Sequence, residues 1–479
     1  VKGSGGAIRC EGNNQVMSYN TFTNNTAQES LGGAICIYGN DLLLEGNHFE
    51  NNAAGNESGA VYLQGINGKG LNQIVSNNHF INNTGPIGGA FSLYHCENFT
   101  IFNNTIIKNH ASTIGGAIRI TGGMNTGIIS ENPFQENYAV QSGGAIYNFG
   151  NKTKITGNKF IKNRVTTFLA GTLYILGLDN IVSDNLIDES ESKTIGGAIY
   201  SEGNNAKIIN NTIKNSKAGT SAGAIYLTGD NVLIDSNIFE NNTASDYAGA
   251  IRIKGDNSVL TNNNFIKNTA EQSGGSLYLI ANNINITKCN FTSNKADEGG
   301  AIWASGNQIN ILQNYINKNT ANKDGGGMNI QGEKVTIANN EINDNSALNG
   351  GAISLGGGEY LIENNYIIDN QAGSCGGAIK IGSKSNNGEI TKNYIKNNIA
   401  NERGGAISLI SNNVEISDNT LIENCATTNV GGTLYISGDY ITISGNKIEK
   451  SFSKSNGGAI NLAGNNAIIK SNKISKKFF

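Results

Sequence analysis

The stretch AGAIYLTGDNVLIDSNIFENNTASDY, from Ala222 to Tyr247, is followed at once by AGAIRIKGDNSVLTNNNFIKNTAEQS, from Ala248 to Ser273. The two segments have the same length and keep glycine, isoleucine and asparagine at the same places, while most other positions change. A fixed period of about 20–50 residues is typical of repeat proteins, whose units bury their apolar faces against one another. We therefore expect this chain to be ordered by the stacking of its own copies.

The same pattern runs through the whole sequence of 479 residues. It is aligned on a glycine that precedes a small and then an aliphatic residue, and this glycine occurs 18 times at intervals of 25–30 residues, from Gly6 to Gly458. The register never breaks, so we predict one continuous repeat domain over residues 1–479. Because the sequence opens at Val1 and enters the repeat at once, we expect a mature part or a fragment of a longer surface protein.

Within each unit the apolar residues recur with a period of two, which indicates short β-strands. In the first quoted unit, strands are expected at 224–228, 232–235 and 238–240, with turns containing Gly, Asp and Asn between them. Equivalent strands stacked in register form parallel sheets, and the crossovers between parallel strands are right-handed. The sequence thus predicts an all-β, single-stranded, right-handed parallel β-helix (a solenoid) of about 18 rungs with three short parallel sheets.

One column of the repeat holds asparagine in 17 of the 18 units, and Cys289 is the exception. A stacked amide can both donate and accept hydrogen bonds at a buried corner where the backbone lacks strand partners. We therefore interpret this column as a structural ladder and not as an active site. Its members include Asn20, Asn47, Asn78, Asn237, Asn263, Asn314 and Asn472.

Composition and charge argue against several partners. The 34 Lys and Arg residues are balanced by 37 Asp and Glu residues, so no excess of positive charge favours nucleic acid. No apolar run is long enough to span a bilayer, so direct membrane insertion of this segment is not expected. The six cysteines fall at different repeat positions without a CxxC pair, and we expect buried free thiols rather than disulfides or metal ligands.

The combination of GGAI with FxxN, as in Gly5–Ile8 and Phe22–Asn25, resembles the paired tetrapeptides of chlamydial polymorphic outer-membrane proteins. The Asn-, Ile- and Lys-rich sequence between these motifs is more similar to the adhesin-like β-helix repeats of methanogenic archaea. The resemblance covers the whole chain. It implies a secreted or surface-attached β-helix with an adhesive role, and it transfers no catalytic residue.

Pectin-degrading enzymes also use the β-helix fold, so catalysis has to be considered. Asp344 and Asp369 each follow a ladder isoleucine by two residues, on neighbouring rungs. They are expected about 5 Å apart, a separation compatible with paired-carboxylate glycoside hydrolysis. The simpler interpretation is two solvated acids, and we predict that the chain is not an enzyme. The alternative is a polysaccharide lyase or glycoside hydrolase of the pectin-degrading class.

Two further pairs of residues have side chains of the kinds that bind metals. His48 and His79 are expected on adjacent rungs, but two imidazoles without further ligands seldom hold zinc. Asp230 and Asp256 are expected to stack at one turn, yet the calcium-binding repeat motif of β-helices is missing. We therefore predict neither a metal nor another cofactor.

One outward column carries planar side chains in seven consecutive units. Its members are Tyr147, Tyr174, Tyr200, Tyr226, Arg252, Tyr278 and Trp303. Exposed planar groups in a row suit the faces of sugars or a protein partner, although stacked tyrosines can also simply favour the sheet. We predict this column as the binding site.

These observations predict a cell-surface or secreted, adhesin-like β-helix without catalysis. Its expected partner is an extracellular glycan or a surface protein of a host or neighbouring cell, and a role as a surface spacer is the other possibility. Open rung edges can pair with other chains, so end-to-end self-association is also expected.

Overall fold

A computed structural model describes residues 2–66, 70–122 and 126–475 of the chain. It comprises two compact units, Val1–Ala244 and Ser245–Phe479. The described residues form no α-helix, and their strands build a parallel solenoid of about 18 turns with four main sheets. The prediction of an all-β parallel β-helix is confirmed, whereas the prediction of a single domain over residues 1–479 stays a prediction. No described segment forms a helix that could cross a membrane.

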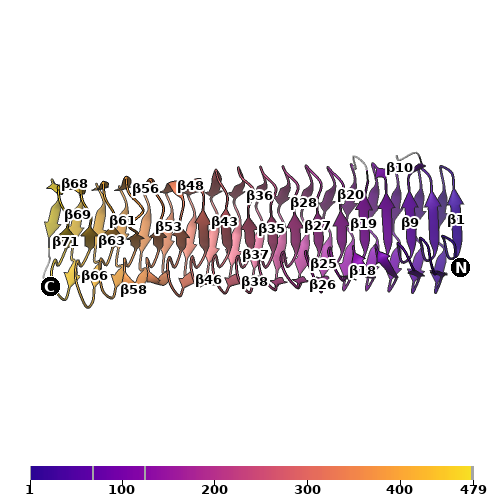
Figure 1. Ribbon diagram of the computed structural model, residues 1–479, viewed down its shortest axis with the longest axis horizontal. Coiled ribbons are helices and arrows are strands. Elements are labelled where there is room, and N and C mark those ends of the chain that lie inside the picture. Colours follow the sequence, from indigo (N-terminus) through magenta and orange to yellow (C-terminus); the bar gives the residue numbers. More distant parts are fainter. Residues whose placement is uncertain (1, 67–69, 123–125, 476–479) are drawn as a thin grey trace. The chain divides into compact units, whose positions relative to one another are not determined.

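In the unit Val1–Ala244, each turn of the coil consists of short strands that pair in register with the turns before and after it (Figure 1). A representative turn contains β35 (Ile225–Leu227), β36 (Leu233–Asp235), β37 (Ile238–Glu240) and β38 (Thr243–Ala244). In that turn Ile225 pairs with Ile199 of the preceding turn. The first three strands coincide with the predicted ones to within one residue at each end.

The prediction of three sheets is wrong by one, because β38 and its equivalents form a fourth parallel sheet. These strands are mostly two residues long, and in β38 only Ala244 is buried. A strand of two residues is too short to show a period of two, so sequence periodicity could not reveal it.

The unit Ser245–Phe479 repeats the same construction. A representative turn contains β51 (Met328–Ile330), β52 (Glu333–Ala338), β53 (Glu341–Asn343) and β54 (Ser346–Asn349). Each of these strands pairs in parallel with the next turn, as Met328 does with Ile353. Outward side chains at equivalent positions of successive turns therefore form straight columns, in which neighbouring residues are about 4.8 Å apart.

The interior of each unit is filled by apolar columns that run from turn to turn. In the first unit the rings of Phe22, Phe49 and Phe80 stack with centroid separations of 5.0 and 4.9 Å. In the second unit Phe265 and Phe291 stack at 4.8 Å. Each stacked ring covers the next one, so no single turn has to bury its own apolar face.

The asparagine column forms a continuous hydrogen-bonded ladder in each unit. Asn47 is representative: its backbone and side-chain N–H groups donate to Oδ1 of Asn78 at 2.9 and 3.1 Å, and its Nδ2 also donates to the carbonyl of Met17 at 2.8 Å. The same pattern includes Asn237, Asn314 and the other buried members. At the first turn, Asn20 makes these bonds to Asn47 although it is exposed.

Cys289 takes the place of asparagine in the ladder without interrupting it. Its backbone N–H donates to Oδ1 of Asn314 at 2.9 Å, and its thiol lies 3.3 Å from the carbonyl of Thr287. The contact with the preceding rung is weaker, since Nδ2 of Asn263 lies 3.9 Å from the sulfur. All six cysteines are free thiols: Cys36, Cys96 and Cys289 are buried, while Cys10, Cys375 and Cys425 are only half-buried.

The corners between the sheets are made by residues in the left-handed conformation. In the representative turn of the second unit these residues are Gly325, Lys334, Asn339 and Asp344, with φ between 53° and 69°. The repeat glycine plays a different part. A Cβ at Gly197 would collide with the carbonyl oxygen of Gly223, whereas the positive φ, +66°, belongs to the preceding Gly196. The aligned glycine is thus required for close backbone approach.

Candidate functional site

The aromatic column of the first unit stands on the outward side of its sheet, but its rings cover one another. Tyr147 stacks on Tyr174 at 4.9 Å, Tyr174 on Tyr200 at 5.0 Å, and Tyr200 on Tyr226 at 5.4 Å, with interplanar angles of 8–17°. Since a stacked ring has a neighbour on its face, a sugar could reach only the ring edges.

The prediction that this column is exposed is wrong. Tyr200 and Tyr226 are 7% and 5% exposed, and Leu169 and Ile195 pack against the cluster from the strand-like segment that precedes the glycine corner. Burial, together with the Glu202 carboxylate that accepts the hydroxyl of Tyr200 at 2.5 Å, raises the pKa of Tyr200 well above its usual range. The tyrosine side chains therefore pack against the outer face of the sheet, and Leu169 and Ile195 cover them.

The three remaining members lie in the second unit and are arranged in the same way. Tyr278 is 8% exposed, and its ring stacks on Trp303 at 4.4 Å. The guanidinium of Arg252 lies over the rings of Tyr278 and Tyr247 at 5.1 and 5.4 Å. Arg252 and Trp303 are half-buried. These contacts are those of a packed cation–π and stacking cluster.

The two acids weighed as catalytic residues occupy neighbouring corners of the second unit. Asp344 and Asp369 are exposed and have φ of 53° and 59°. The carboxylate of Asp369 accepts a hydrogen bond from Nδ2 of Asn397, the corner residue of the next turn. Asp and Asn tolerate the left-handed conformation better than most residues do, which gives both acids a role in the turn.

The pairs considered as metal ligands are also accounted for by local contacts. The rings of His48 and His79 lie 6.1 Å apart, and Nε2 of His48 is 3.1 Å from the Glu50 carboxylate. Asp230 and Asp256 belong to different units; the Asp230 N–H donates to Asn204, and the Asp256 carboxylate accepts the N–H of Asn282. Over the described ranges, no three His, Cys, Asp or Glu side chains group as a metal site.

A groove that the sequence analysis missed lies on the outward face of the second unit. Two cavities of about 280 and 390 Å³ lie side by side over the turns from Glu333 to Glu389, and a third of about 270 Å³ continues them to Thr442; Asn387 lines all three. The groove crosses β52, β56 (Tyr360–Glu363), β60 (Gly388–Thr391), β64 (Val414–Ser417) and β68 (Thr442–Ser444). We call it the β60–β64 groove.

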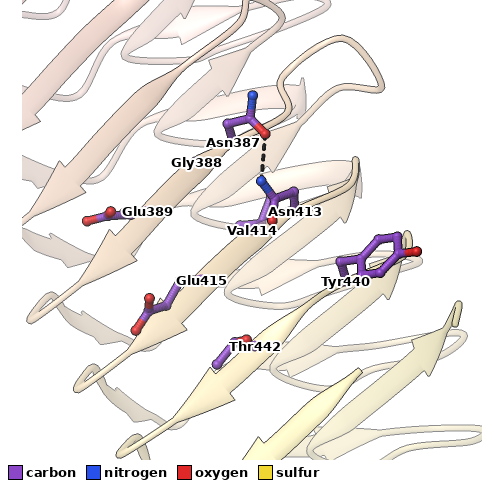
Figure 2. A pocket seen from close by; sticks show the side chains of 8 residues that line it. All are labelled: Asn387, Gly388, Glu389, Asn413, Val414, Glu415, Tyr440 and Thr442. Atoms are coloured by element: carbon purple, nitrogen blue, oxygen red, sulfur yellow. Dashed lines mark hydrogen bonds between the residues drawn. The ribbon is translucent and has the colours of Figure 1, made fainter. Parts of the chain in front are cut away.

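The floor of the β60–β64 groove carries two glutamates on neighbouring strands. Glu389 of β60 is in register with Glu415 of β64, and Figure 2 shows both side chains projecting from the same face. Both are exposed. The next residues of this column are Leu361 on one side and Thr442 on the other.

One wall of the groove is formed by corner residues with positive φ. Asn413 donates from Nδ2 to Oδ1 of Asn387 at 2.7 Å (Figure 2), and Tyr440, a residue that is 61% exposed, follows them in the next turn. Lys334 continues the wall at the other end. The groove thus combines carboxylates, primary amides, the ammonium groups of Lys334 and Lys384 and one accessible aromatic side chain, which can bind a polar, extended ligand.

A sequence signal for this groove exists but differs from the one that led to Asp344 and Asp369. Gly388-Glu389-Ile390 and Val414-Glu415-Ile416 place a glutamate directly before an inward isoleucine in two successive repeats. Because strand residues alternate between the two faces, each glutamate has to point outward. Asp344 and Asp369, by contrast, follow the inward isoleucines of a different strand by two residues and therefore lie at corners.

The comparison with protein families identifies the fold. Residues 1–126, 146–316 and 197–367 match the model of the right-handed β-helix region family. A solved structure, the A-module of the mannuronan C-5 epimerase AlgE6 of Azotobacter vinelandii, aligns over 99% of this chain and 92% of its own, with 12% identity and a TM-score of 0.20. That score is too low to carry an argument. No curated protein matches the sequence significantly.

The family match covers well over half of the 479 residues, and it agrees with the parallel coil that the strands form. It also confirms the predicted right-handed sense of that coil. The chain belongs to the right-handed β-helix family.

Proposed function

We propose that this chain is a surface-displayed or secreted, adhesin-like β-helix that binds an extended extracellular glycan in the β60–β64 groove without chemically changing it. The observation that carries the proposal is the set of three adjoining cavities that together extend from Glu333 to Thr442, lined by amides, carboxylates, two lysines and the exposed Tyr440. The similarity of the repeats to adhesin-like β-helix proteins supports the placement outside the cell.

The groove suits a chain molecule better than a compact one. Its lining groups follow one another at the spacing of the turns, about 4.8 Å, so a polymer lying along the stack meets a further polar group at most steps. Amide ladders such as Asn387–Asn413 offer both donors and acceptors to sugar hydroxyls. An exposed tyrosine ring can pack against the apolar face of a sugar.

The test is a binding titration with soluble oligosaccharides of neutral, acidic and amine-bearing types, monitored by calorimetry. The informative variant is Tyr440→Asn, because asparagine already occupies the equivalent corners and keeps the left-handed turn. Tyr366→Thr is the matched control, since Tyr366 is similarly exposed, at 58%, but belongs to a different sheet.

We expect at least one class of oligosaccharide to bind, Tyr440→Asn to weaken that binding about tenfold, and Tyr366→Thr to leave it unchanged. Absence of binding by every class would refute the proposal. If both substitutions change the affinity for the oligosaccharide equally, the glycan does not bind at Tyr440.

A polysaccharide-cleaving activity is the second candidate. It is favoured by the in-register Glu389 and Glu415, because paired carboxylates can act as acid and base in glycoside hydrolysis. Incubation with neutral, amine-bearing and acidic glycans, including pectins, followed by assays for reducing ends and unsaturated products, distinguishes the two functions. Turnover that disappears in Glu389→Gln would replace the adhesin proposal by the enzymatic one.

A further inference from the structure

The two glutamates on the groove floor repel each other. Glu389 and Glu415 are register partners on adjacent parallel strands, whose backbones lie about 4.8 Å apart. Like charges directly opposite each other destabilise a sheet. Their column neighbours, Leu361 and Thr442, carry no charge that could offset the repulsion. The rest of the groove adds Glu333, Glu359, Lys334 and Lys384, so four carboxylates face two ammonium groups and the lining as a whole stays negative.

Other acids of the same unit are differently placed. Glu423 lies 2.6 Å from Nζ of Lys450, and that ammonium group lowers the pKa of Glu423 below its usual value. Asp324 forms an ion pair with Lys380, with 2.8 Å between Oδ1 and Nζ. In the part of the chain that the structure describes, by contrast, neither Glu389 nor Glu415 has an ion-pair partner. Their charge is therefore left for solvent or for a ligand.

The position of this uncompensated charge inside the groove indicates what the ligand carries. The pair lies on the floor of a cavity of about 270 Å³ that is also lined by Asn387, Asn413 and Tyr440. A cationic group placed over the pair would meet two carboxylates, while the amides and the Tyr440 ring, which line another part of the same cavity, could bind neighbouring parts of the ligand. An acidic glycan would instead be repelled.

We infer that the glycan bound in the β60–β64 groove carries protonated amino groups, as a partly de-N-acetylated hexosamine polymer does. The inference rests on the proposed function, and it specifies the class of ligand for the same site. A divalent cation or an acidic polysaccharide is not the expected occupant.

The test compares three soluble probes at a pH where sugar amines are protonated and carboxylates are ionised: chitosan oligosaccharides, fully N-acetylated chitooligosaccharides of the same length, and oligogalacturonides. The protein is used as the whole chain, unmodified and as Glu389→Gln/Glu415→Gln. Asp344→Asn/Asp369→Asn is the matched control, because it removes the same charge from two exposed acids on neighbouring turns outside the groove floor. Circular dichroism and melting confirm that all three forms are folded.

We expect the chitosan probe to bind about tenfold more tightly than its acetylated counterpart and to weaken with added salt. The glutamine variant should lose that preference, whereas the asparagine control should keep it. Equal affinity for the acetylated and de-acetylated probes, or an equal loss in both variants, overturns the inference but leaves glycan binding intact. Failure of all three probes overturns the proposed function as well.

Discussion

Replacement of one ladder asparagine in the second unit, Asn340→Ala, tests how much the amide ladder stabilises the coil. Oδ1 of Asn340 accepts the backbone N–H and Nδ2 of Asn314 at 2.8 and 3.0 Å. Its own Nδ2 donates to Oδ1 of Asn365 at 3.0 Å and to the carbonyl of Ile311 at 2.8 Å. The side chain is 1% exposed, so water cannot simply replace it.

The expected cost follows from the groups that lose a partner. The backbone N–H of Asn314 loses its acceptor, and a buried unpartnered donor costs about 2 kcal/mol. Nδ2 of Asn314 keeps its bond to Ile286, and Oδ1 of Asn365 keeps the backbone N–H of residue 340. These two losses, and the loss of one donor by the carbonyl of Ile311, are each nearer to about 1 kcal/mol. We expect the free energy of unfolding to fall by about 5 kcal/mol.

Chemical denaturation monitored by circular dichroism measures this change, and amide hydrogen exchange shows whether the loss is confined to the neighbouring turns, as expected for a repeat protein. Asn310→Ala is the control, because Asn310 stands on the outward face and its Nδ2 donates a single bond, to Asn285 at 2.9 Å. A loss of less than about 1 kcal/mol for Asn340→Ala, or an equal loss in the control, would refute the view that the ladder is a main source of stability.

Three further outcomes are expected. Gly388→Val should unfold its turn, because a Cβ there would collide with the ring of Tyr360. In a double-mutant cycle, adding Tyr360→Val should recover most of the stability, and independent effects of the two substitutions would contradict the contact. Cys289→Asn should raise the free energy of unfolding by about 1 kcal/mol by replacing the 3.9 Å contact to the sulfur with an amide hydrogen bond, and a lower melting temperature would count against it. Burial raises the pKa of Tyr174 to about 12, whereas an unfolded tyrosine ionises near pH 10. The contribution of Tyr174 to stability is therefore complete below about pH 10 and is lost as the pH rises to about 12. An absorbance titration should show this late ionisation, and ionisation of every tyrosine near pH 10 would contradict it.

The strand positions were accessible from sequence because the repeat supplies many copies of the same alternation. The strand 238–240, for example, is found with the predicted bounds. The fourth sheet was not accessible, since a pair such as Thr243–Ala244 has no periodicity of its own. Many copies of a repeat therefore make a strand easier to predict only if a single copy already shows its alternating pattern.

The functional surface was harder to predict because outward position does not mean exposure. Tyr200 and Tyr226 point away from the interior of the coil, yet Leu169 and Ile195 from a neighbouring segment cover them. A repeat alignment gives the direction of a side chain but not what a loop places over it. Such cover depends on tertiary packing, which also left the glutamates of the β60–β64 groove accessible.

The asparagine ladder also gives each unit a direction. In ordinary parallel pairing, the backbone N–H groups along a strand alternate between its two neighbours, so the peptide dipoles along the stacking direction largely cancel. The side-chain amides do not alternate: Nδ2 of each asparagine donates to Oδ1 of the following turn, as Asn314 does to Asn340 and Asn340 to Asn365. The column is thus polar, with acceptor oxygens facing one way and donor nitrogens the other. A turn from another copy could continue it only head to tail, because head-to-head contact would bring two carbonyls together.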